Sequence, residues 1–168
     1  SWLNTALAMV LEHSPQLIID ADGLNALARN MDHYQQMLLH RRLRGLEPAI
    51  LTPHPGEFSR LAPDLDWSDR QTAAARLAAR LDSMVLLKGA STVIAHPDGR
   101  VWINPTGNAG LAKGGSGDVL CGLIAGLCAQ GLQAFEAAAA GAYLHGLAAD
   151  LAADLASGGT GPRSLLPG

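Results

Sequence analysis

Three short apolar runs recur along the chain, and polar or glycine-rich residues follow each of them directly. The runs cover residues 17–20, 49–52 and 84–87, and the first ends in an acid. Short continuous runs of this kind are typical of strands that are buried on both faces. Helical segments separate the runs, and this alternation predicts an α/β fold with a mainly parallel sheet and helices on both of its faces.

Apolar residues at helical spacing predict the helices of this fold. Pro15 stops the first helix, and Ser68 is expected to cap the third, whose apolar face lies over 73–81. The five expected helices cover residues 1–11, 24–30, 68–81, 118–130 and 134–155.

Two turns also follow from the sequence. Asp98 and Gly99 are typical of a tight hairpin turn, here between strands over 92–95 and 101–103. Prolines on both sides of His54 continue neither a strand nor a helix, so His54 is expected in a stiff loop.

Length and charge limit what the chain can be. Its 168 residues fit one domain over 1–168, with an irregular tail rich in Gly, Pro and Ser at 157–168. The formal net charge of −3 argues against a nucleic-acid partner, because phosphate backbones are bound through clusters of Lys and Arg. The basic cluster of Arg41, Arg42 and Arg44 is expected at a helix end, with solvated side chains.

The cysteines and the hydropathy bear on location. Cys121 and Cys128 lie in an apolar helical stretch, where two turns separate them by about 10 Å. That separation is too long for a disulfide, so we expect two buried, reduced thiols in a cytoplasmic protein. No run is long and apolar enough to span a membrane, and the first residues lack the features of a signal peptide.

The glycine-rich turn over 114–118, with the sequence GGSGD, opens the fourth helix. Its glycines allow backbone N–H groups to converge at a helix N-terminus, which predicts an anion hole formed by Gly115, Ser116 and Gly117. Asp118 is the candidate catalytic residue, and the alternative is that it only caps the helix. No Gly-Lys-Ser/Thr follows the glycines, so the turn is not a P-loop.

Polar clusters follow the predicted strands, and ligands of parallel sheets bind at the carboxyl ends of strands. We therefore expect these clusters to meet along one edge. They begin at Asp20, Thr52, Lys88 and Asn104.

Four segments resemble, in order and spacing, the ADP-dependent NAD(P)H-hydrate dehydratases, a carbohydrate-kinase-like family of the ribokinase-like superfamily. They are DADGLNAL at 20–27, TPHPGE at 52–57, LKGAST at 87–92 and NAGLAKGGSGDVL at 108–120. The resemblance implies a ribokinase-like fold. Family members carry an earlier strand-rich region that would precede Ser1, so we expect an N-terminally truncated domain that lacks its first strands and is inactive alone.

The resemblance also implies a reaction and its participants. A hydroxyl of hydrated NADH or NADPH (NADHX or NADPHX) attacks the terminal phosphate of ADP, AMP leaves, and loss of phosphate restores the dihydronicotinamide. ADP is the expected cosubstrate, with Mg²⁺. Family members commonly form homo-oligomers, and in many bacterial relatives a hydrate epimerase domain precedes the dehydratase.

Roles for individual residues follow from the same resemblance. Asp118 matches the catalytic acid/base and is also expected to contact the substrate. His54 and Asn25 are expected to be substrate contacts only. No residue is assigned as a metal ligand. The matching nucleotide-binding residues are Lys88, Gly89, Ala90, Ser91, Thr92 and Gly117.

Simpler interpretations stay open for several of these residues. Lys88 could face solvent, His54 could be a loop histidine, and Asp20, Asp22 and Asn25 could be turn and cap residues rather than neighbours of substrate or Mg²⁺. At the level of function, the alternatives are a small-molecule kinase of the same superfamily, acting on a thiazole or pyrimidine alcohol, and a non-catalytic nucleotide-binding fragment.

Overall fold

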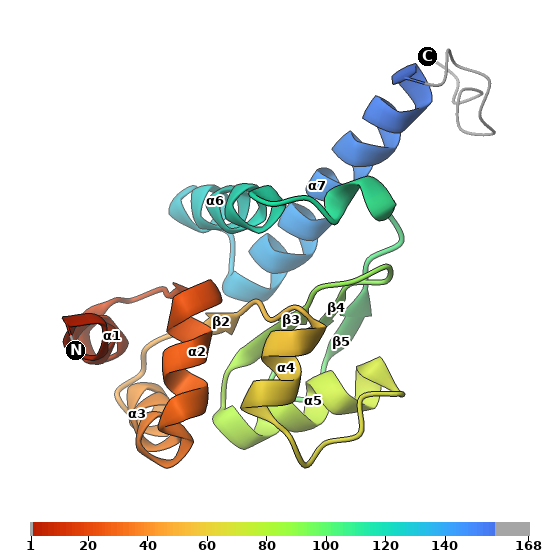
Figure 1. The fold of residues 1–168 in the computed structure, drawn as a ribbon. Coiled ribbons are helices and arrows are strands. Elements are labelled where there is room, and N and C mark those ends of the chain that lie inside the picture. The colour runs from red at the N-terminus through yellow and green to blue at the C-terminus, as the bar shows by residue number, and fades with distance from the viewer. Residues whose placement is uncertain (1, 157–168) are drawn as a thin grey trace.

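A computed structural model describes residues 2–156, so the tail expected at 157–168 lies outside the described residues. A five-stranded sheet forms its centre, in the order β1-β2-β3-β4-β5 (Figure 1). Strands β1, β2 and β3 are parallel, whereas β4 and β5 are antiparallel additions through the expected hairpin. The strands cover Ile18–Ile19, Ile50–Leu51, Met84–Leu87, Val93–Ala95 and Val101–Ile103.

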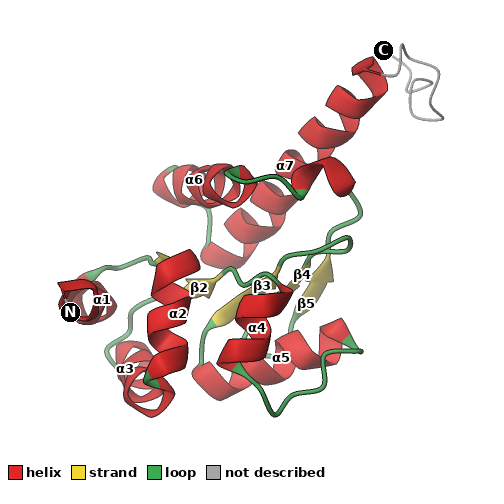
Figure 2. Cartoon of the chain, viewed as in Figure 1, coloured by secondary structure: helices red, strands yellow, loops and turns green. Residues whose placement is uncertain are grey.

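Helices cover both faces of this sheet, which confirms the predicted α/β class (Figure 2). Helices α1 to α5 lie on one face, and α6 and α7 lie on the other. The helices are α1 (Trp2–His13), α2 (Ala21–Arg29), α3 (Met31–Leu43), α4 (Pro55–Leu61), α5 (Arg70–Leu81), α6 (Ser116–Ala129) and α7 (Ala134–Ala156), with the short 3-10 helix η1 (Ala109–Leu111) before α6.

Alternate residues of β3 divide the interior into two cores. Val85 and Leu87 pack with α1 to α5, whereas Met84 and Leu86 pack with α6 and α7. All four are fully buried. This is the pattern of a strand covered on both sides, as its continuous apolar sequence predicts.

The helices differ from the predictions in several places. Helices α3 and α4 were not predicted, and α4 begins at Pro55, directly after His54. Proline is favourable at the first helical position because the N–H group it lacks has no helical partner there, so the expected stiff loop is in fact a helix start. The cap of α5 is Asp69, whose side chain accepts from Gln71 N and Thr72 N, and not Ser68.

The prediction for Arg41 is wrong. Its side chain is only 1% exposed, and its guanidinium donates to the carbonyl oxygens of Leu11, Pro15 and Glu47 at 3.2, 2.8 and 2.8 Å. Burial lowers the pKa of this guanidinium. Arg41 therefore joins the end of α1 to α3 inside the protein.

The two cysteines are free, and only Cys128 is buried as expected, because Cys121 is partly exposed. None of the helices within the described residues could cross a membrane.

Candidate active site

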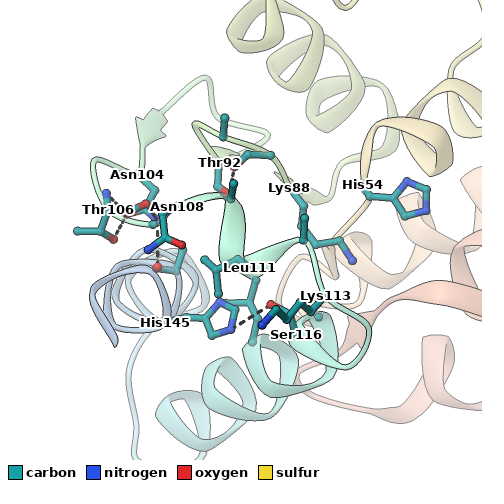
Figure 3. A pocket seen from close by; sticks show the side chains of 18 of the residues that line it. His54, Lys88, Thr92, Asn104, Thr106, Asn108, Leu111, Lys113, Ser116 and His145 are labelled. Atoms are coloured by element: carbon teal, nitrogen blue, oxygen red, sulfur yellow. Dashed lines mark hydrogen bonds between the residues drawn. The ribbon is translucent and has the colours of Figure 1, made fainter. Parts of the chain in front are cut away.

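A cavity of about 680 Å³ lies beside the carboxyl end of β3, between the β3–β4 turn, the loop after β5 and the N-terminus of α6 (Figure 3). Its wall includes many of the residues singled out in the sequence. Of the candidates, those in the lining are His54, Lys88, Gly89, Ala90, Thr92, Ser116 and Gly117. Ser91, Gly115, Asp118 and Asn25 lie outside the lining.

Lys88 and Asp20 form an ion pair across the sheet, from the ends of β3 and β1. Lys88 Nζ donates to both carboxylate oxygens of Asp20, at 2.9 and 3.1 Å, and the two side chains are only 22% and 18% exposed. Burial by itself raises the pKa of Asp20, but the hydrogen bond and the charge of Lys88 outweigh it and lower the pKa below its usual value. Asp20 is thus held ionised, and Lys88 does not face solvent freely.

The backbone around Asp20 has an unusual conformation. Asp20 occupies the N-cap position of α2 but makes no side-chain cap bond, so its carboxylate is used for Lys88 instead. Ala21 has a φ of 47°, in a region that residues other than glycine rarely adopt. Such conformations carry a cost and cluster at functional sites.

Glu57 and His54 are joined through the first turn of α4. Nδ1 of His54 accepts from Gly56 N at 2.9 Å and from Glu57 N, while Glu57 Oε2 accepts from His54 N at 2.9 Å. This reciprocal pair is a capping box. Glu57 is buried, and its Oε2 lies 4.0 Å from Lys88 Nζ. The structure therefore makes His54 a helix cap whose ring also borders the cavity.

The N-terminus of α6 lies against the ion pair. Gly115, at the N-cap, has a φ of 85°, which a glycine adopts without strain. A Cβ atom on Gly117 would lie 3.3 Å from Asp20 Oδ2 and 3.4 Å from Lys88 Nζ, so the absence of a side chain lets the helix approach the charges closely. The first N–H groups of α6, with the partial positive charge of a helix N-terminus, thus lie beside Lys88, where they suit an anion.

Asp118 and Asn25 are placed less centrally. Asp118 is exposed in the first turn of α6. Asn25 lies in α2, where its Oδ1 accepts from Arg60 Nε at 3.0 Å. Neither borders the cavity, and their roles remain predictions.

The far wall of the cavity is the segment after β5, which α7 holds in place. Asn104 Nδ2 donates to the carbonyl oxygen of Ala142 at 3.0 Å. Asp150, only 4% exposed, accepts from Gly107 N and from Asn108 Nδ2 at 2.9 and 3.0 Å. Sequence reasoning missed Asp150, and an acid within an alanine-rich helix was the only signal for it.

His145 is a second residue whose position was not foreseen. It comes from α7 and lines the cavity, and its Nε2 lies 3.4 Å from Ser116 Oγ (Figure 3). Burial lowers its pKa, which favours the neutral ring. His145 therefore links α7 to the turn at the start of α6.

Cys121, one turn further along α6 than Gly117, also contacts Asp20. Its thiol donates to Asp20 Oδ2 at 3.5 Å and lies 3.7 Å from Thr52 Oγ1. Burial raises the pKa of this thiol, and the charge of Asp20 raises it further. Cys121 is therefore a neutral hydrogen-bond donor here.

Comparison with known proteins supplies a family. A family model described as NAD(P)H-hydrate dehydratase matches residues 1–166. A bifunctional NAD(P)H-hydrate repair enzyme of Moorella thermoacetica is 53% identical over 81% of this chain and 25% of the relative. An ADP-dependent (S)-NAD(P)H-hydrate dehydratase of Neisseria meningitidis is 42% identical over 89% of this chain and 50% of the relative.

Solved structures agree with these relatives. An ADP/ATP-dependent NAD(P)H-hydrate dehydratase from Bacillus subtilis, co-crystallised with ATP and Mg²⁺, is 36% identical with a TM-score of 0.73 over 90% of this chain and 51% of that one. A ribokinase-like superfamily protein from Enterococcus faecalis gives a TM-score of 0.67 at 32% identity, over 91% of this chain and 50% of that one. The ribokinase-like fold is thereby confirmed. The chain spans between a quarter and a half of the length of the curated relatives described.

Proposed function

Since this chain belongs to the NAD(P)H-hydrate dehydratase family, we propose that the protein carrying it dehydrates (S)-NADHX and NADPHX to NADH and NADPH at the expense of ADP. The products are AMP and phosphate, and the net reaction is that of a carbon–oxygen lyase. The observation that supports this most is the approach of the α6 N-terminus to the Lys88–Asp20 pair at one end of the cavity. A cavity of about 680 Å³ also lies within the usual range for small-molecule sites.

The nucleotide occupies this cavity in our proposal. Its phosphates lie at the start of α6, near the ammonium of Lys88, where the N–H groups of Gly115 and Gly117 compensate their charge. The N–H of Ser116 would join this anion hole only by giving up its bond to the carbonyl oxygen of Lys113, at 3.2 Å. The segment from Lys88 to Thr92 borders the rest of the nucleotide, with Ser91 in the exposed turn.

Asp118 is the proposed base. A carboxylate in the first turn of α6 lies next to the phosphates and is open to a second substrate from the solvent side. It accepts the proton of the hydrate's hydroxyl while that oxygen bonds to the β-phosphorus of ADP and the bond to AMP breaks. The phosphate ester then loses phosphate, which restores the ring. His54 and Asn25 are the proposed substrate contacts.

The residues present fit a magnesium ion that is bound mainly through the nucleotide. Mg²⁺ in phosphoryl-transfer sites takes one or two carboxylates together with phosphate oxygens and water. Asp20, held ionised, and buried Glu57 both lie beside Lys88 but do not border the cavity, so they would hold the ion through water molecules. When bound, the ion would neutralise phosphate charge. Within residues 2–156, no cluster of three or more His, Cys, Asp or Glu could hold a metal alone.

Product analysis separates this function from its alternatives. The full-length protein is incubated with NADHX and ADP, and the expected result is AMP, phosphate and recovery of the near-ultraviolet absorbance of the reduced nicotinamide. A stable phosphate ester of a thiazole or pyrimidine alcohol would instead identify a small-molecule kinase. Nucleotide binding without turnover of either substrate would identify a non-catalytic module.

Three further expectations stay predictions. They are the cytoplasmic location, the homo-oligomeric state, and an epimerase domain in the parent protein. The last accords with the bifunctional name of the Moorella relative.

A further inference from the structure

Arg70 lies at the first position of α5, behind the turn that connects β3 to β4. Its Nη2 donates to the carbonyl oxygens of Leu87 and Lys88, both at 3.0 Å. It does not border the cavity, whereas Lys88 does. One guanidinium nitrogen thus holds two successive carbonyls at the point where the strand becomes the cavity wall.

The guanidinium also lies flat against Gly89. A Cβ atom on this glycine would meet Arg70 Nη2 at 2.6 Å, Cζ at 3.0 Å and Nη1 at 3.1 Å. Distances below 3.0 Å require something to shift. Gly89 and Arg70 therefore fit together, and the turn cannot keep this position with a larger residue at 89 while the arginine stays in place.

The other side of Lys88 is fixed as well. Its backbone N–H donates to the carbonyl oxygen of Pro53 at 2.8 Å, at the end of β2. With Arg70 on its carbonyl oxygen, the backbone of Lys88 is held from two directions. The side chain starts from this fixed backbone and reaches Asp20 and the start of α6.

Arg70 makes these bonds at a cost. Burial lowers the pKa of its guanidinium, and no salt bridge to a carboxylate is found for it within the described residues. Its Nε is buried and makes no hydrogen bond to the described part of the chain.

We propose that Arg70 is a positioning residue for the nucleotide: it sets the Lys88–Gly89 turn so that the Lys88 ammonium faces the phosphates before the nucleotide binds. This rests on the proposed function, because it assumes that the cavity takes ADP. A preset turn avoids the entropy loss of ordering the wall during binding. The proposed contacts of the hydrate are His54 and Asn25, which Arg70 does not touch, so binding of the hydrate should not depend on Arg70.

The first test compares Arg70→Lys and Arg70→Met with Arg76→Met in the full-length protein. Arg76 is an exposed arginine of the same helix and serves as the matched control. Both Arg70 variants should raise the Kd of ADP in calorimetry and the KM for ADP by roughly tenfold or more. The KM for the hydrate and kcat at saturating ADP should stay within about threefold.

A double-mutant cycle tests the fit between Arg70 and Gly89. Gly89→Ala should weaken ADP binding strongly in the wild-type background and clearly less in the Arg70→Ala background, where the clash with the guanidinium is gone and only the strain of an alanine at a φ of 159° remains. Equal losses in both backgrounds overturn the proposal. So does an ADP affinity that is unchanged in a folded Arg70→Met variant while only the melting temperature falls.

The two hypotheses fail in different ways. If the protein binds ADP but does not convert the hydrate, the proposed function is wrong, and the calorimetric arms still decide the role of Arg70. If the hydrate is converted and the Arg70 variants bind ADP like wild type, only the positioning role is wrong.

Discussion

At the scale of single residues, the Lys88–Asp20 pair is the feature on which the site depends. Removing one partner of a partly buried pair leaves the other charge uncompensated in a poorly solvated place. Asp20 also accepts from Cys121, and Glu57 Oε2 lies 4.0 Å from Lys88 Nζ, so the charge of Lys88 compensates two carboxylates.

Replacing Lys88 by Met should therefore destabilise the fold in a pH-dependent way. In the wild type, the pKa of Asp20 is lower in the folded state, so its contribution to stability is present above its unfolded value of about 3.9 and is lost as the pH falls through the folded value. Without Lys88, burial raises that pKa. Urea unfolding should show the largest loss in the free energy of unfolding near neutral pH and a smaller loss near pH 3.

Lys113→Met is the control for this prediction, because Lys113 is an exposed lysine of the same cavity wall. It should leave stability unchanged at every pH. A Lys88→Met loss that is the same at all pH values would contradict the ion-pair interpretation.

Asp118→Asn tests the proposed base. The rate should fall by about a hundredfold to ten-thousandfold, since proton transfer contributes that much, while the Kd of ADP stays within about threefold because the helix N–H groups remain. Single-turnover kinetics and calorimetry measure the two quantities. Asp32→Asn, an exposed acid in the first turn of α3, is the matched control. Near-full activity of Asp118→Asn would exclude Asp118 as the base.

At the scale of elements, the contact between α7 and the segment after β5 shapes the far wall of the cavity. This contact depends on Gly146. A Cβ atom there would clash with Thr106 Oγ1 and lie 2.7 Å from the Thr106 carbonyl carbon and 2.9 Å from Gly107 N. Backbone atoms cannot move aside cheaply, so the segment would have to shift.

Gly146→Ala should accordingly destabilise the protein by about 2 kcal/mol, as overpacking of a close contact does, despite the better helix propensity of alanine. The Gly107 N–H donates a hydrogen bond to Asp150, and its hydrogen exchange should become faster if the segment after β5 is displaced. Gly122→Ala in α6, with open space around it in the described structure, should instead be neutral or stabilising by up to about 1 kcal/mol. Equal stability of both variants would contradict the close-contact explanation.

The elements also show where sequence reasoning succeeds. The strands were predictable because sheets covered on both faces require continuous apolar runs. Helix α3 was not, because its buried face consists of Tyr34, Leu38 and Arg41, and a hydrophobicity pattern does not recognise an arginine as an interior residue. The candidate site was only partly predictable. Its local motifs were visible, but the contacts of Arg70 and Asp150 join residues that are distant in sequence and carry no local signal.

At the scale of the whole molecule, Arg41 joins the helical layer on one face of the sheet. Arg41→Met would leave the carbonyl oxygens of Leu11, Pro15 and Glu47 without their donor. The expected loss in the free energy of unfolding is about 3 kcal/mol, measured by urea denaturation. Arg29→Met, at an exposed arginine of α2, should change it by less than about 0.5 kcal/mol. A similar small change for Arg41→Met would contradict its structural role.

The proposed order of steps determines where the hydroxyl oxygen of the hydrate goes. If the hydrate's hydroxyl is phosphorylated before elimination, its oxygen leaves with the phosphate, whereas direct loss of water would release it to solvent. Recovery of the dihydronicotinamide ring does not distinguish these two routes, because both give NADH.

The most direct measurement follows that oxygen. NADHX that carries the heavy oxygen isotope in its hydroxyl group is incubated with the full-length protein and ADP, and the released phosphate is analysed by mass spectrometry. Phosphoryl transfer beside the α6 N-terminus predicts the label in phosphate, with equal amounts of AMP and NADH formed. Label in water, with ADP unconsumed, would contradict it.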